Sequence, residues 1–276
     1  MQIRVGYEMV YQCYQPTPMI LSLTIHSSRS NDLVKADRIV TDPPVPVHGY
    51  HDTFGNWCSR VMAPPGRFMI TSDAVVNDTG LGDDVAPNAE QIPVEQLPDD
   101  TLLYLLQSRY CETDLLSNMA WQRFGSGPTG WARVEAICDF ANKQIQFGYH
   151  NARRTRTAAE AFNEGVGVCR DYAHLAITLC RCMNIPARYC NGFLGDIGMP
   201  PPYGTMDFAA WIEVYLGGRW YTFDPRNHQY MPRIGRVLIA RGRDAADVAL
   251  ASTFGPNLLE GFKVWTDEVV AMPARL

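Results

Sequence analysis

The stretch that decides the fold reads Gly165-Val-Gly-Val-Cys169-Arg-Asp171-Tyr-Ala-His174-Leu-Ala-Ile-Thr-Leu-Cys180. Two glycines permit a tight turn, and apolar residues recur after it at helical spacing. The pattern therefore predicts that Cys169 opens a buried helix. The free N–H groups and the positive end of a helix favour a thiolate and can bind an oxyanion, so this position suits a reactive thiol. The alternative is a small buried hydrophobic residue, which is what most free cysteines are.

A second motif follows downstream, Met206-Asp-Phe-Ala209-Ala210-Trp211-Ile-Glu213-Val-Tyr-Leu-Gly-Gly-Arg-Trp-Tyr-Thr-Phe-Asp224-Pro225. Its alternation and its Gly-Gly pair predict two strands joined by a tight hairpin. Together with the cysteine turn, this order resembles the transglutaminase-like superfamily of thiol enzymes. In that family the nucleophile opens a helix, a histidine precedes Ala-Trp on a strand, and an aspartate ends the next strand. The resemblance implies that Cys169 is the nucleophile and Asp224 the acid of a catalytic triad, with Ala209 at the position of the family histidine.

Ala209 departs from the family pattern. A Cys-His-Asp triad needs the imidazole to take the thiol proton and to protonate the leaving amine, and alanine does neither. Two explanations are open: an active enzyme inactivated by replacement of its histidine, or a natural pseudoenzyme. The retention of Cys169, Asp171, Trp211 and Asp224 favours the inactivated enzyme. Without an imidazolium, we expect a thiol that is mostly protonated at neutral pH, because an unshielded Asp224 opposes the helix end.

Four further residues are candidates for substrate binding: Trp211, Tyr149, Arg170 and Asp171. The tryptophan would form a floor under the missing imidazole, since alternate residues of a strand share a face. The other three flank or face residues 153–156, the one basic cluster of the chain. Such a cluster suits an acidic or carboxylate-bearing substrate. A solvated loop explains it equally well.

Two histidines near the motifs are weaker candidates for a replacement base. His174 lies five residues after Cys169, a rotation of about 140° on a helix, so its side chain is expected to face elsewhere. His228 lies four residues beyond Asp224 and is expected to point away from the thiol.

The composition indicates a globular chain. It has 276 residues, is 46% hydrophobic and carries a net charge of -5, which argues against binding to nucleic acid. The sequence has no run of about 18 apolar residues, so no membrane-spanning helix is expected. The start of the chain shows the alternation of a strand and carries charges, which is not the pattern of a signal peptide. We therefore expect a cytoplasmic protein without a membrane partner. The eight cysteines contain no CxxC pair and the chain has no nucleotide-binding glycine motif, so neither a metal nor a cofactor is expected. The oligomeric state is left open.

The chain divides into three parts by composition. Residues 1–78 alternate like strands and predict a small all-β domain. Residues 79–100 are rich in Gly, Asp and Pro and predict a linker. Residues 101–276 are expected to form the catalytic core, with helices at 101–107, 115–124 and 131–145, a capping box at Thr157, and strands at 236–240 and 262–270 that complete a sheet on the Cys169 helix. The expected fold class is α+β: a papain-like or transglutaminase-like core, helices plus antiparallel sheet, preceded by the all-β domain.

These features favour an enzyme that acts on amide bonds through a thioester on Cys169. The resemblance implies hydrolysis rather than crosslinking, with a peptide, an isopeptide or an amino-acid polymer such as cyanophycin as the partner. Two rivals remain: a catalytically dead core that binds peptides, and a structural or partner-docking protein in which Cys169 contributes packing. Restoring a histidine at position 209 separates the enzyme from both, and thiol reactivity tests the last.

Overall fold

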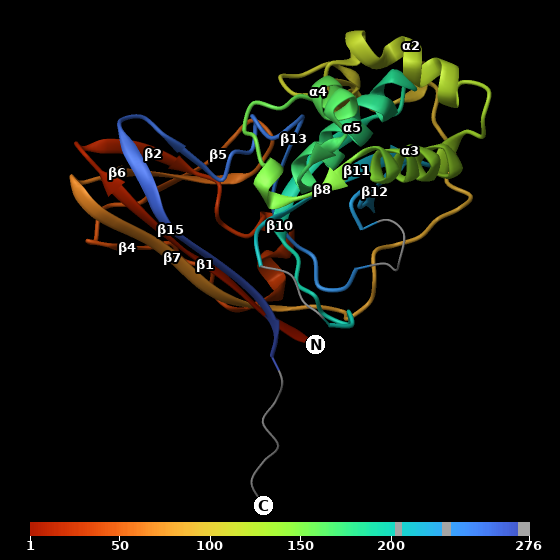
Figure 1. Cartoon of the computed structure of the whole chain (residues 1–276). Coiled ribbons are helices and arrows are strands. Elements are labelled where there is room, and N and C mark those ends of the chain that lie inside the picture. Colours follow the sequence, from red (N-terminus) through yellow and green to blue (C-terminus); the bar gives the residue numbers. More distant parts are fainter. Residues whose placement is uncertain (202–205, 228–232, 270–276) are drawn as a thin grey trace, which may run out of the picture.

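The structure, a computed structural model, describes residues 1–201, 206–227 and 233–269. Figure 1 shows two lobes, one made of long strands and one in which helices lie over a separate sheet. The fold is α+β, with helices, antiparallel sheets and an N-terminal all-β region, as the sequence predicts.

The elements follow the chain in this order. The strands are β1 (Gln2–Cys13), β2 (Thr17–Leu21), β3 (Leu33–Lys35), β4 (Val40–Asp42), β5 (His48–His51), β6 (Trp57–Ala63), β7 (Gly66–Asn77), β8 (Gln146–Phe147), β9 (Val166–Gly167), β10 (Ala187–Phe193), β11 (Ala209–Leu216), β12 (Arg219–Phe223), β13 (Val237–Gly242), β14 (Ala251–Thr253) and β15 (Asn257–Glu268). The α-helices are α1 (Asp99–Leu102), α2 (Thr113–Phe124), α3 (Gly130–Gln144), α4 (Ala158–Glu164) and α5 (Cys169–Cys182). Short 3-10 turns are η1 (Ser27–Asp32), η2 (Val94–Gln96), η3 (Leu103–Leu105) and η4 (Tyr149–Asn151).

The strand lobe contains two antiparallel sheets. One has the order β15-β1-β7-β3, with β4 also paired to β7, and the other has the order β14-β2-β6-β5. Alternate residues of β7, from Phe68 to Val76, are buried, and the odd-numbered residues of β1 opposite them are buried too. This period of two gives each long strand one apolar face, which is what lets the sheet bury a core on one side.

The last strands of the chain return to this lobe. β15 pairs antiparallel with β1, and β14 pairs with β2. The expectation that the strand near 262–270 completes the sheet on the Cys169 helix is therefore wrong; its last residue lies outside the described part of the chain. The reason is that the apolar face of β15 continues the apolar face of β1: Val264 lies opposite Tyr7, and both side chains are buried. The division at residues 78 and 100 stays a prediction, and the region 101–276 holds two strands that pair outside it.

The helical lobe is built around α5. Its sheet has the order β12-β11-β10-β13, so the strand predicted at 236–240 is confirmed as β13. Almost every residue of α5 after its first two is buried, with α2, α3 and α4 packed on it and β11 beneath. Trp131 of α3 reaches the same sheet, with its ring 4.5 Å from that of Phe223. The helix that presents Cys169 is thus fixed on several sides.

The local predictions hold for some helices and fail for others. The capping box is confirmed: the Thr157 side chain accepts from the Glu160 N–H at 3.3 Å, and the Glu160 carboxylate accepts from the Thr157 N–H at 2.9 Å. The helix expected at 101–107 is shorter, because α1 ends at Leu102 and a 3-10 turn follows. Within the described residues, no helix is both long and apolar enough to span a membrane.

Aromatic rings join the two lobes. Phe208, just before β11, lies 6.0 Å from the ring of Tyr7 on β1 and 5.2 Å from that of Phe193 on β10. Its ring also lies 5.8 Å from that of Phe262 on β15. Tyr7 has no exposed surface, so this aromatic joint is a dry contact between the strand lobe and the residues that lead into β11.

We expect Tyr7→Ala to lower the free energy of unfolding by about 3–5 kcal/mol, because it leaves a cavity in this joint. Tyr14→Ala is the matched control: that side chain is 63% exposed, and its loss should change the free energy by less than about 0.5 kcal/mol. Urea unfolding followed by circular dichroism measures both. Equal effects would show that the joint is not part of the cooperative core.

Candidate active site

The turn before Cys169 has the conformation that the glycines predict. Gly165 ends α4 in the left-handed region, with φ of 66°. Residues 166–167 then pair in parallel with β8, and α5 begins at Cys169. The prediction that Cys169 opens a buried helix is confirmed. Its side chain keeps partial exposure, whereas the other seven cysteines are buried, and all eight are free thiols.

Asp171 holds this turn together. Its carboxylate accepts from the Val168 N–H at 2.9 Å and pairs with Arg156 at 3.2 Å. A Cβ on Gly167 would come within 2.7 Å of the same carboxylate, so only glycine permits the approach. Burial raises the pKa of Asp171, and the Val168 N–H and the two arginines Arg170 and Arg156 oppose this rise. Asp171 has no exposed surface, and its hydrogen bond and ion pair are with the loop before Cys169 and with Arg156. Its assignment to substrate binding stays a prediction.

The thiol meets the beginning of β11. Burial raises the pKa of Cys169 above its ordinary value, and Asp207 and Asp224 raise it further. The guanidinium of Arg226 and then the backbone N–H of Ala210 oppose this rise. The direction of this shift agrees with the prediction of a thiol protonated at neutral pH, which stays a prediction. The predicted cause is wrong in part, because burial comes first and Asp224 contributes least of these groups.

Asp224 is not the unshielded charge that the sequence suggested. Its carboxylate accepts from the side chain of Asn227 at 2.9 Å and pairs with Arg236 at 3.2 Å. Burial alone would raise the pKa of Asp224, but Arg236 and the Asn227 hydrogen bonds outweigh it and leave the pKa below its usual value. Asp224 therefore stays ionised and already has a cationic partner, whose guanidinium lies 4.6 Å from the ring of Trp211.

Ala209 and Trp211 share one face of β11. Trp211 is 1% exposed and forms a small apolar cluster with Cys190 and Leu238, and Ala209 packs against that cluster. Ala210, between them, belongs to the main core. Trp211 is thus a buried floor next to position 209 rather than an exposed contact surface. That an imidazole at 209 would reach the sulfur stays a prediction.

The other candidates for substrate binding divide into two kinds. Tyr149 is 45% exposed, and its pKa is raised first by burial, then by Asp207 and by Cys169. Its contact with a substrate stays a prediction. Arg170 instead donates to the backbone carbonyls of Arg153 and Arg154, so it secures the basic loop.

The basic cluster is largely paired within the fold, and His174 is engaged away from the thiol. Arg153 pairs with Glu164 at 2.7 Å, and Arg156 with the same residue at 2.9 Å. His174 is buried, as expected, and its Nε2 accepts from the Ala245 N–H at 3.1 Å. His228 lies outside the described residues.

Sequence reasoning missed two residues beside the thiol, Asp207 and Arg226. The guanidinium of Arg226 lies 3.8 Å from the centre of the Phe147 ring, and its backbone carbonyl accepts from Asn142 at 2.7 Å. It is the first cation among the groups that lower the pKa of Cys169. The available signal in the sequence is its position two residues after Asp224.

Comparison with known families agrees with this geometry. Residues 120–225, which include Cys169, Ala209 and Asp224, match the family model of the transglutaminase-like superfamily. This part of the chain is therefore similar to that superfamily.

Similar proteins extend the comparison to the whole chain. A crystal structure from Cytophaga hutchinsonii, described as a "putative cysteine protease", superposes with a TM-score of 0.82 at 29% identity, over 99% of this chain and 93% of that one. An uncharacterized protein of Mycobacterium leprae is 25% identical over 80% of this chain and 81% of its own length. An uncharacterized protein of Mycobacterium tuberculosis is 33% identical over 42% of this chain and 40% of its own length.

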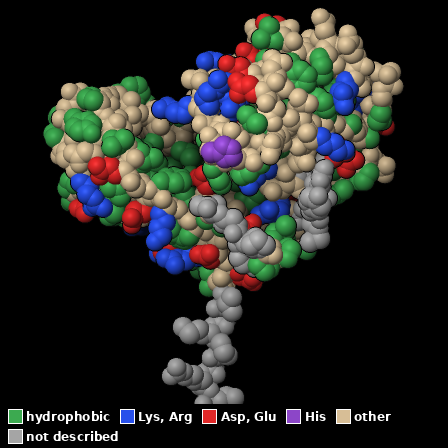
Figure 2. Space-filling model, viewed as in Figure 1, with side chains coloured by type: hydrophobic (Ala, Val, Ile, Leu, Met, Phe, Trp, Pro, Cys, Tyr) green, Lys and Arg blue, Asp and Glu red, His purple; other side chains and the backbone are tan. Residues whose placement is uncertain are grey.

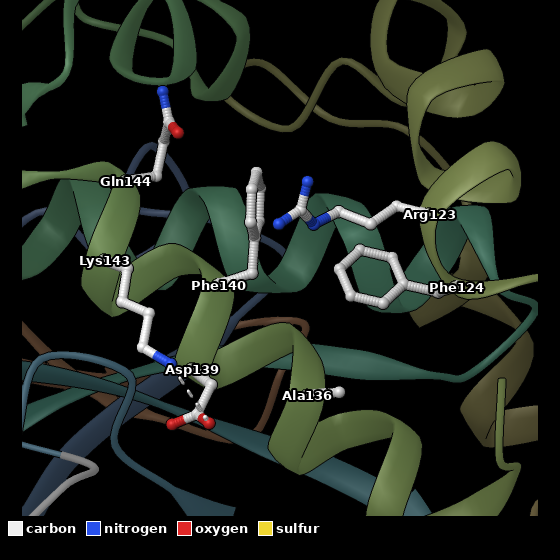
Figure 3. Close-up of a pocket in the computed structure, with 7 residues that line it drawn as sticks. All are labelled: Arg123, Phe124, Ala136, Asp139, Phe140, Lys143 and Gln144. Atoms are coloured by element: carbon white, nitrogen blue, oxygen red, sulfur yellow. Dashed lines mark ion pairs between the residues drawn. The ribbon is translucent and has the colours of Figure 1, made fainter.

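A pocket of about 500 Å³ lies between α2 and α3 (Figure 3). The guanidinium of Arg123 lies 4.3 Å from the ring centre of Phe140, and Asp139 pairs with Lys143 at 3.8 Å. Its lining residues all belong to α2 and α3, whereas Cys169 begins α5, so the pocket is separate from the transglutaminase-like site. Among the described residues, no group of three or more His, Cys, Asp or Glu could hold a metal ion.

We expect Arg226→Met to raise the pKa of Cys169 further, because it removes the cation that most favours the thiolate. The rate of iodoacetamide modification at neutral pH should fall, and its midpoint should move to higher pH. Arg219→Met is the control, since Arg219 pairs with the distant Asp84 at the surface. Peptide mapping of modified Cys169 across pH gives the profile of each variant. If the Arg226→Met profile coincides with that of the unaltered chain, Arg226 does not influence the pKa of Cys169.

Proposed function

We propose that this fold is a thiol-dependent hydrolase, or acyl transferase, for amide bonds of a peptide, an isopeptide or an amino-acid polymer. The Cys169 sulfur would attack the amide carbonyl, forming a thioester and releasing the amine, which takes up the thiol proton. Water would then cleave the thioester, giving a carboxylic acid and the free thiol. A second amine in place of water would give transamidation.

One observation supports this proposal above the others: β11, which begins at Ala209, packs against α5, which begins at Cys169. Asp224 directly follows β12, the strand paired with β11. The order of thiol, position 209 and carboxylate is the order of a Cys-His-Asp triad. Similarity to the Cytophaga hutchinsonii protein supports the same class of reaction.

The chain as it stands lacks the group that would move the proton. Alanine at 209 cannot accept the thiol proton or deliver it to the leaving amine. We therefore propose that this form binds its substrate and turns it over far more slowly than a form with histidine at 209.

A second candidate function is a natural peptide-binding pseudoenzyme. The observation in its favour is that the site accommodates alanine well: the Ala209 methyl packs on the Trp211 cluster, and Arg236 pairs with the carboxylate that an imidazolium would otherwise meet. In this alternative, a histidine at position 209 would compete with the guanidinium of Arg236 for the carboxylate of Asp224.

Ala209→His separates the two. If the fold is an enzyme, the new imidazolium should stabilise the thiolate, move the midpoint of Cys169 alkylation below neutrality, and restore thioester formation with a peptide amide. Asp224→Asn in the same background is the control and should reverse much of the gain.

The measurements are a pH profile of iodoacetamide modification and mass spectrometry of the acyl-enzyme. If the profiles of the unaltered chain and the Ala209→His variant coincide, with no acyl-enzyme in either, the enzymatic proposal is removed and the binding module is left.

A further inference from the structure

The edge strand β15 presents apolar side chains toward the gap between the lobes. β15 pairs with β1 on one side, and no strand of the described chain pairs with its other side. Leu259 lies opposite Tyr11, and Phe262 lies opposite Met9, so both face the same way as the buried residues of β1. Their partners on β1 are buried, yet Leu259 is 45% exposed and Phe262 is 43% exposed.

This apolar face is continuous with the surroundings of the thiol. The Phe262 ring lies 5.8 Å from the ring of Phe208. Phe208 directly precedes β11, the strand that packs against α5, and α5 begins at Cys169. The buried Phe208 ring thus joins the exposed face of β15 to the strand that lies against the nucleophile's helix.

A hollow separates this face from the helical lobe. Figure 2 shows it between the two lobes, with hydrophobic side chains gathered on its walls. On the helical side, Arg154 is near enough to Tyr11 to act on its pKa, which burial raises to about 12. Tyr149, on the same segment as Arg154, is 45% exposed.

We propose that the exposed inner face of β15, Leu259 and Phe262, binds a bulky apolar side chain of the substrate next to the amide that Cys169 attacks. The inference rests on the proposed function and adds a substrate class to it. Exposed apolar surface of this kind, beside a nucleophile and between two walls, is what a specificity pocket for an aromatic or long aliphatic side chain requires. The strand lobe then selects the substrate, and the helical lobe supplies the nucleophile.

Affinity labelling tests this on the protein as it exists, because alkylation needs no base at position 209. The probes are 2-chloroacetamide and its N-(2-phenylethyl) derivative, with each rate divided by the rate for free cysteine at the same pH. We expect the phenylethyl reagent to modify Cys169 roughly tenfold faster, since its ring leaves water on the inner face of β15. Peptide mapping assigns the modification to Cys169 among the eight cysteines.

Three variants locate the effect. Phe262→Ala and Leu259→Ala should each reduce the tenfold preference, which is the ratio of the two normalised rates for the same variant, to roughly threefold or less. Leu258→Ala is the matched control: it is 54% exposed on the same strand but lies opposite Gln12, on the other face, so the preference should persist. Urea unfolding of each variant confirms that it is folded.

The outcomes separate the two levels of the proposal. If neither reagent modifies Cys169 even in alkaline solution, the proposed function fails and this inference fails with it. Equal normalised rates for both reagents would keep the function and overturn the apolar site. If Phe262→Ala and Leu259→Ala leave the preference for the phenylethyl reagent intact, the substrate site is overturned. If the same variants also abolish self-association in sedimentation, the face instead pairs the β15 edges of two copies.

Discussion

The buried ion pair between Asp171 and Arg156 is the constraint on which the site depends. Asp171 has no exposed surface, and its carboxylate fixes the Val168 N–H directly before the nucleophile. A charge buried in this way is tolerated only when it is paired and hydrogen-bonded, and breaking the pair leaves an uncompensated charge in the core. The turn, the start of α5 and the basic loop therefore share one electrostatic anchor, and the position of the Cys169 sulfur follows from it.

A second network sets the charge around position 209. Arg236 pairs with both Asp83 and Asp224, so the carboxylate keeps its charge without an imidazolium. Asp83 belongs to the segment that connects the two lobes. Arg236 therefore links Asp224 to that connecting segment. The pKa of the thiol, by contrast, is raised mainly by burial, and Arg226 is the main group that opposes this rise. The carboxylate of the site thus keeps its charge through a direct ion pair, whereas burial favours the protonated thiol.

The sequence predicted the parts of the fold that depend on local patterns. The Cys169 helix, the capping box at Thr157 and the hairpin at Gly217-Gly218 each rest on residues close together in the chain, and each is present. The placement of β15 failed, because pairing with β1 joins residues some 250 positions apart and alternation alone does not name a partner. Arg226 was missed for a similar reason. Its importance comes from the thiol that folding brings beside it, not from any motif around it.

The return of β15 to β1 also bears on how the chain folds during synthesis. The long sheet of the strand lobe includes strands from both ends of the described chain, and the helical lobe is inserted between them. A ribosome-bound chain can complete β10, β11, β12 and β13 around α5 before residues 257–268 emerge, whereas β1 waits for its second neighbour until then. Contacts so distant in sequence form slowly, and an unpaired strand edge is prone to aggregation while it waits. The order of synthesis therefore makes the helical lobe the first unit to fold and the strand lobe the one that most needs protection.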